Sequence, residues 1–225
     1  MSTLKVDKID PSSGTALEIG SSGDTMTVPS GAQLTVASGA TIDVSACTLT
    51  PPATMPASSG ANLTGFTASQ MPAGSVIQLK HTSTSAVATT STRIPHDDTI
   101  PQNTEGGQVM SLAITPTSAT NKLVINVNTY ASQQGAHEQV CSALFQDSTA
   151  NALASMAFRG GDQGGDEHPC SFTHVMVAGT TSSTTFKVRV GSGHASYTTT
   201  FNGTGGSRIF GGSLSSSITI MEVVA

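Results

Sequence analysis

One group of side chains that could carry chemistry stands together at His96, Asp97 and Asp98. An imidazole beside two carboxylates has the composition of the acid–base groups that a hydrolase uses. Catalysis also requires hydrogen-bond reach to a nucleophile or a water, which adjacency in the sequence does not supply. Because Pro95 and Pro101 flank the group, we interpret it as a solvated loop and predict that the protein is not an enzyme.

A glycine-rich stretch from Arg159 to Pro169 holds a second group of polar side chains. Asp162, Asp166 and Glu167 carry carboxylates, the oxygen ligands that calcium prefers, on a backbone flexible enough to wrap a cation. A calcium loop places its ligands at stricter positions, so we interpret the stretch as an exposed loop, with bound calcium as the alternative. We predict neither a metal nor a cofactor.

The composition indicates which elements hold these side chains. Charged residues make up only 10% of the 225 residues, and the abundance of serine, threonine and glycine favours strands and turns over helices. The net charge is −5 and the nine lysines and arginines are scattered, so we predict no nucleic-acid partner. No apolar run approaches the roughly 20 residues that a bilayer requires. The opening residues also lack a signal-peptide pattern, so we predict synthesis in a cytoplasm and no membrane insertion.

Three cysteines, Cys47, Cys141 and Cys170, cannot all pair with one another. They also lack the close spacing of a zinc or redox motif. We therefore predict reduced or buried thiols, and a Cys141–Cys170 disulfide is the open alternative.

Residues 25–48 repeat with a period of eight. Apolar residues two apart occupy matching columns in each copy, which predicts short one-sided strands, and Ser-Gly supplies a corner between them. A repeat this small cannot bury its apolar face without stacked neighbours, and three copies of the chain around one axis would provide them. The pattern predicts a homotrimeric β shaft at residues 17–50, with a flexible linker as the alternative. The two columns are Met26, Leu34 and Ile42, and Val28, Val36 and Val44.

The chain changes character after the repeats. Residues 51–71 are rich in proline, glycine and serine and predict an extended connector. Residues 72–225 alternate apolar and polar side chains between turn clusters, which predicts a β-sandwich or jelly-roll head and an all-β protein. Residues 150–158 also fit a helix, but their β-rich surroundings favour a strand. The predicted strands lie at 75–80, 108–114, 122–130, 139–146, 152–159, 172–177, 184–190, 197–201 and 217–224.

Several phrases in the same order resemble bacteriophage tail fibre proteins: the opening residues 1–9, the Ser-Gly-Ala octads, residues 60–78 and residues 114–123. The resemblance covers about the first half of the chain and the closing residues 218–224. It implies a trimeric virion protein whose N-terminal residues 1–16 attach to tail proteins and whose C-terminal head mediates host attachment. Between Ser132 and Phe210 no phrase carries over, so the resemblance assigns no receptor-binding residue.

Receptor binding requires exposed groups on loops that a rigid sandwich holds in place. We expect them in segments 132–138, 160–168, 191–197 and 202–208, contacting a host glycan or an outer-membrane receptor. A tyrosine ring can stack on a sugar face, and carboxylates and arginine can bond its hydroxyls. The predicted receptor contacts are His137, Asp162, Asp166, His168, His194, Tyr197 and Arg208.

Two other functions remain open from the sequence. One is a structural collar or decoration protein that binds neighbouring virion subunits, which a flat apolar patch would favour over a cleft. The other is a tailspike that cleaves a glycan with paired carboxylates, for which the chain is short. In a trimer a lone histidine can also meet its copies in a three-fold metal site, although no His-x-His pair favours one.

Overall fold

The computed structural model describes residues 70–135, 139–160 and 167–225, with a few isolated positions between residues 25 and 35. The described part is built of antiparallel strands, which confirms the all-β prediction for the head. The predicted attachment segment and almost all of the octad shaft and of the connector lie outside the described residues. Within the described ranges, no helix is long and apolar enough to span a membrane.

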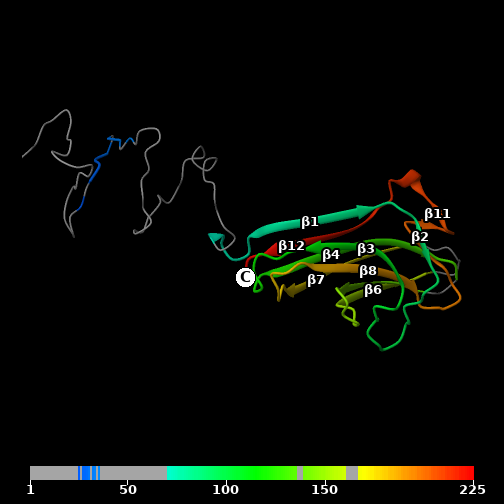
Figure 1. The fold of residues 1–225 in the computed structure, drawn as a ribbon. Coiled ribbons are helices and arrows are strands. Elements are labelled where there is room, and N and C mark those ends of the chain that lie inside the picture. The colour runs from blue at the N-terminus through cyan, green and yellow to red at the C-terminus, as the bar shows by residue number, and fades with distance from the viewer. Residues whose placement is uncertain are drawn as a thin grey trace, which may run out of the picture. The chain divides into compact units, whose positions relative to one another are not determined.

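Strands of different lengths follow one another from residue 76 to residue 223 (Figure 1). Residues 154–159 form a strand, as the sequence predicted, and not the alternative helix. In chain order the elements are β1 (Val76–Thr84), β2 (Ala88–Thr90), β3 (Gly107–Ile114), β4 (Lys122–Gln133), β5 (Gln139–Gln146), β6 (Ala154–Arg159), β7 (Glu167–Val177), β8 (Thr184–Ser192), β9 (Thr199–Phe201), β10 (Gly203–Thr204), β11 (Ser207–Arg208), the 3-10 turn η3 (Phe210–Gly212) and β12 (Ser216–Val223).

The long strands form two sheets that pack face to face. The first sheet has the order β1-β12-β4-β7, and the short strands β2 and β9 continue the lines of β1 and β12 beyond a break. The second sheet has the order β3-β8-β5-β6. The chain crosses repeatedly between the sheets so that strands distant in sequence pair, which is the jelly-roll arrangement.

Apolar side chains on the inner faces of both sheets form the core. Leu123, Ile125 and Val127 alternate along β4 and are fully buried, as the period of two predicted. On β8 the side chains of Phe186 and Val188 face them from the other sheet. The alternation therefore explains both the strand positions and the sidedness of the sheets.

The outer face of the second sheet is also covered. Ile94, from the segment between β2 and β3, packs on Cys141, Ala143 and Phe145 of β5. Because β5 is thus buried on both faces, residues 140–145 are apolar except for Ser142 and do not alternate with polar residues.

The two described cysteines, Cys141 and Cys170, are free thiols. Cys141 packs under Ile94, whereas Cys170 lies on β7 within hydrogen-bonding distance of the Val140 carbonyl, so the alternative disulfide is not formed. Cys47 lies outside the described residues.

Both thiols are expected to resist modification in the folded head. Burial, reinforced by Cys170, raises the pKa of Cys141 to about 12, and burial also raises the pKa of Cys170. A thiolate is the reactive species, so in a Cys47→Ser background a thiol reagent at pH 8 should label neither cysteine until denaturant is added. Mass spectrometry after labelling measures this, and rapid labelling of the native protein would contradict the buried positions.

Candidate functional site

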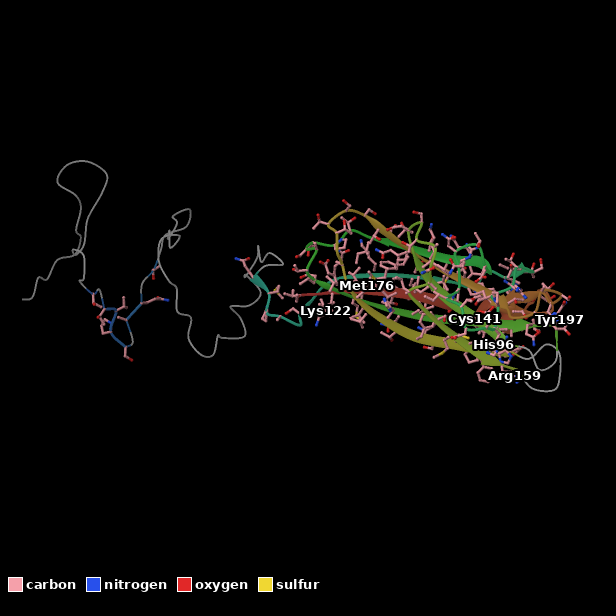
Figure 2. The ribbon with its side chains drawn as sticks, turned by 90° about the horizontal axis from the view of Figure 1, so that it is seen from below. His96, Lys122, Cys141, Arg159, Met176 and Tyr197 are labelled. Atoms are coloured by element: carbon pink, nitrogen blue, oxygen red, sulfur yellow. The ribbon has the colours of Figure 1, made fainter. Side chains whose placement is uncertain are left out.

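The two ends of the sandwich differ. At the base end β1 begins and β12 finishes, next to the point where the chain enters from residue 70. At the loop end β4, β6 and β8 terminate, at Gln133, Arg159 and Ser192. Figure 2 shows Lys122 and Met176 towards the base end, and His96, Arg159 and Tyr197 at the loop end. The loops predicted to bind a receptor therefore leave strands that end together.

The segment from Ser91 to Gly106 crosses the outside of the second sheet and is fixed at both ends. Its Ile94 N–H donates to the Ser192 carbonyl of β8 over 2.9 Å. Its Asn103 side-chain amide donates to the carbonyls of Ser148 and Thr149 over 3.1 Å each, in the turn before β6. We name this stretch the crossing segment. Residues 96–98 are exposed and outside any strand, as the sequence predicted, and the buried Ile94 attaches the segment to the sheet.

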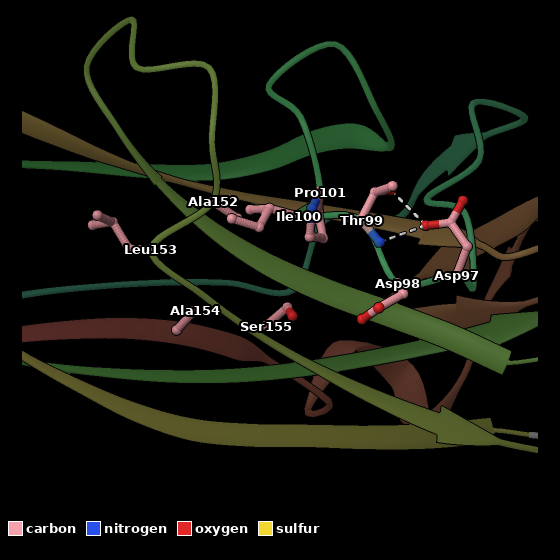
Figure 3. Close-up of a pocket in the computed structure, with 9 residues that line it drawn as sticks. All are labelled: Asp97, Asp98, Thr99, Ile100, Pro101, Ala152, Leu153, Ala154 and Ser155. Carbon is pink, nitrogen blue, oxygen red and sulfur yellow. Dashed lines mark hydrogen bonds between the residues drawn. The ribbon is translucent and has the colours of Figure 1, made fainter.

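A groove runs between the crossing segment and the edge strand β6. Its first part is a cavity of about 390 Å³ between residues 97–101 and residues 152–155 (Figure 3). A second pocket of about 130 Å³ shares Asp97 and Ser155 with the first. A third pocket, of about 360 Å³, shares His96 and Asp97 with the second and reaches the loop end. The three adjoining pockets offer an open, elongated site on a rigid framework.

Asp97 occurs in all three pockets and has a fixed orientation. Its Oδ1 accepts hydrogen bonds from the Thr99 N–H, over 2.9 Å, and from the Thr99 hydroxyl (Figure 3). These bonds, foremost the one from the hydroxyl, lower the pKa of Asp97, with smaller contributions from Arg93 and His96. The carboxylate therefore stays ionised, with its Oδ1 held by Thr99.

The groove is most polar at the loop end. There Arg93 from the crossing segment and Arg159 from β6 supply cations, and Gln139 at the start of β5 supplies an amide. Gly193 makes room for that amide, because a Cβ at this position would collide with Gln139 Nε2. Donors and acceptors thus gather in a concave site, an arrangement suited to hydrogen-bonding a polar ligand.

Two aromatic rings continue from Gly193. The His194 and Tyr197 rings lie 4.7 Å apart at a tilt, and His194 is exposed. Tyr197 is half-buried against Gly135, where a Cβ would collide with the ring. The rings form a small aromatic surface at the loop end, directly after Gly193, which lines the polar part of the groove.

The structure separates the predicted receptor contacts into groups. His194, Tyr197 and Arg208 lie at the loop end, and Arg208 is exposed on β11. His168 was expected on an exposed loop, but it points inside the sandwich and is buried, with its ring 4.5 Å from that of Phe158. It follows the start of β7 by one residue, and the alternation of that strand turns it inward. The predicted contacts outside the described residues are His137, Asp162 and Asp166.

Sequence reasoning missed Arg93 and Gln139 and used Arg159 only as a loop boundary. These residues belong to three segments that no short motif connects. Proline on both sides of residues 96–98 was a signal for irregular backbone, but it did not show that the segment lies across a sheet. Among the described residues, no three histidine, cysteine, aspartate or glutamate side chains are placed to share a metal ion.

No protein-family model matches this chain, and no curated protein matches it. Its fold is similar to the C-terminal domain of EclA, a sugar-binding protein, at 18% identity and a TM-score of 0.32, over 67% of this chain and 96% of that one. It is similar to the CBM36-1 domain of a multidomain xylanase from the hindgut metagenome of Trinervitermes trinervoides, at 10% identity and a TM-score of 0.30, over 63% and 96%.

It is also similar to the VP2 subviral particle of infectious bursal disease virus, at 14% identity and a TM-score of 0.33, over 67% of this chain and 39% of that one. The structural neighbours of the head thus include a domain of a sugar-binding protein, a domain of a xylanase and a viral particle protein.

Proposed function

We propose that this chain is a bacteriophage tail fibre, a structural protein of the virion that attaches the phage to its host by binding a surface glycan. It acts by binding and not by catalysis. Residues 1–16 join it to the tail, the octads form a trimeric shaft, and the jelly-roll head carries the receptor site. Synthesis takes place in the cytoplasm of the host, before assembly.

The observation that carries the proposal is the position and chemistry of the groove. It lies on the side of the head and opens at the loop end, away from the base end where β1 begins. Its polar part combines arginine, amide and carboxylate groups, which match the vicinal hydroxyls and acidic groups of surface sugars. The adjoining His194 and Tyr197 rings offer an apolar face of the size of a sugar ring.

The test is binding of the purified full chain to host cells and to a glycan array. The double variant Arg93→Ala/Arg159→Ala removes both cations from the polar part of the groove. Because a hydrogen bond to a charged group contributes about 1.5–3 kcal/mol, we expect affinity to fall by about 10- to 100-fold or more. The control variant Lys80→Ala/Lys187→Ala removes the same charge from strands β1 and β8, at positions that line none of the three pockets.

The control is expected to bind as well as the wild type. If the arginine and lysine variants lose affinity equally, general charge attraction and not the groove holds the ligand. If the arginine variant binds fully, the receptor site lies elsewhere on the head.

A second function has one observation in its favour. The first sheet exposes apolar side chains on its outer face, including Leu79 and Val175, as a decoration protein that packs on other virion subunits would. That function predicts binding to purified phage particles lacking this protein and no binding to cells. Glycan cleavage by Asp97 and Asp98 would instead release shortened sugars during the binding assay, and we expect none.

A further inference from the structure

The outer face of the first sheet is divided into an apolar half and a polar half. The four lines of strands align side chains in rows across the sheet. One row consists of Leu79, Met221, Val124 and Val175, which are direct partners from β1 through β12 and β4 to β7. Leu79 is 59% exposed and Val175 is 54% exposed, although a row of this kind is normally covered.

The neighbouring row towards the base end extends the apolar surface. Its partners run across the same four lines, and three of the four are valines. Lys122 stands between them on β4, where its long side chain can reach solvent. We name the two rows together the base patch: Val76, Leu79, Lys122, Val124, Val175, Val177, Met221 and Val223.

The rows towards the loop end are polar and internally bonded. His81 Nδ1 lies 2.8 Å from the Thr219 hydroxyl, and the Thr173 hydroxyl donates to Asn126 Oδ1 over 2.6 Å. Beyond them the Ser171 hydroxyl donates to an asparagine of β4 in the same manner. The outer face of the first sheet thus exposes hydrogen-bonded polar side chains towards the loop end and rows of apolar side chains towards the base end. On the described outer face of the first sheet, the base patch is the part that requires a cover.

We propose that the base patch is where the heads of three copies of this chain pack against one another. The inference rests on the trimeric shaft of the proposed function. The chain enters the head beside this patch, where the Gly74 N–H donates to the Val224 carbonyl and the Val224 N–H donates to the Ser75 carbonyl. A shaft of three chains therefore delivers three base patches to one place.

The connection of each head to the shaft explains why another copy of this chain covers the base patch. Residues 51–71 connect the octads to β1, and a connector of this length holds the heads at a local concentration of about a millimolar. A modest apolar area that would be too small to join free monomers then becomes sufficient. The patch carries one lysine and no acidic residue, so it lacks the charges that would select a different protein partner. Three such faces around an axis form a closed apolar core, with the loop ends directed outward.

The experiment is hydroxyl-radical footprinting of the full chain, with the oligomeric mass measured by light scattering on the same sample. Leu79 and Met221 report on the base patch, and Phe210, which is 71% exposed in η3, is the internal reference. We expect a trimeric mass and oxidation of Leu79 several-fold slower, relative to Phe210, than its exposure in the single chain dictates.

Two variants of β7 locate the contact. Val175→Asp places a charge in the base patch, whereas Thr173→Asp places the same charge two residues along the same face, in the polar half. Leu79 should lose its protection in the first variant and retain it in the second. Val175→Thr keeps the β-branched shape and serves if the aspartate variant does not fold, and it should weaken the protection partially.

Each result separates the interface from the function. A trimer with freely oxidised Leu79 overturns the interface and leaves the trimeric fibre standing. A monomer with protected Leu79 shows that the preceding residues of the same chain cover the patch, which overturns packing between copies. A monomer with exposed Leu79 removes the trimer and the interface together. Glycan binding by the groove is measured independently of all three.

Discussion

Glu222→Ala is expected to lower the free energy of unfolding by about 3 kcal/mol, since it removes the acceptor of one buried and three partly buried hydrogen bonds. The Glu222 carboxylate is fully buried, and its Oε1 accepts from the Thr117 N–H over 2.8 Å, the Thr117 hydroxyl over 2.7 Å and the Asn121 amide over 2.7 Å. It also accepts from the Ser118 N–H over 3.3 Å. One side chain at the end of β12 therefore holds the turn between β3 and β4. Denaturant unfolding followed by circular dichroism measures the loss.

The pH dependence of this effect has a defined sign. Burial raises the pKa of Glu222, but hydrogen bonds from Asn121, Thr117 and Ser118 lower it and prevail, so the folded pKa lies below its ordinary value. A carboxylate of this kind contributes its full stability above the unfolded pKa and loses it as pH falls through the folded pKa. Glu222→Gln, which keeps an oxygen acceptor, should be less damaging than alanine. The advantage of the wild type over glutamine should shrink below about pH 4.

An advantage over Glu222→Gln that is constant from pH 7 to pH 3 would contradict the ionised carboxylate. Equal stability of Glu222→Ala and wild type would contradict the clamp on the turn. The two variants thus test the charge and the hydrogen bonds separately.

Gly106→Ala is expected to destabilise the protein by about 3 kcal/mol and to disturb the groove. Gly106 has a φ of +63°, and a Cβ there would lie 2.7 Å from the Val190 carbonyl oxygen and 2.9 Å from the Ile94 side chain. Backbone cannot yield as a flexible side chain can, so the crossing segment must lift from the second sheet. Since Ile94 holds that segment, affinity of the remaining folded protein for its ligand should also fall.

Gly179→Ala is the matched control. Gly179 has a similar φ of +68°, but a Cβ there meets nothing within 4 Å. Alanine at this position meets no steric clash and must only adopt the left-handed backbone conformation, which costs about 1 kcal/mol. Thermal unfolding and ligand binding of both variants give the comparison. If the two alanines destabilise equally, close packing of the crossing segment on β8 is not what requires glycine at position 106.

Much of the head could be predicted because the relevant signal is local. Leu123, Ile125 and Val127 alternate with polar residues, and an extended chain turns every second side chain to the same face. Turn clusters such as residues 115–121 then mark where strands end. The same rule puts Phe186 and Val188 on one face of their strand. Residues of the octad shaft follow an equally regular pattern, and the trimeric shaft stays a prediction.

The site could be predicted only in part, because its residues become neighbours through long-range pairing. The loop position of His194 and Tyr197 could be predicted from the turn residues near them, and their role in receptor binding stays a prediction. His168 was misplaced because its orientation depends on the register of β7 against β4, and a shift of one residue reverses it.

The sequence by itself determined that this protein is all-β, which strands are one-sided and where the turns fall, because alternation and turn chemistry act over a few residues. Only the tertiary structure decided that Arg93, Gln139 and Arg159 share one groove and that Leu79, Met221, Val124 and Val175 share one exposed row. Those neighbours are far apart in the chain. They meet only when the two sheets have closed around the buried core, which fixes the register of every strand at once.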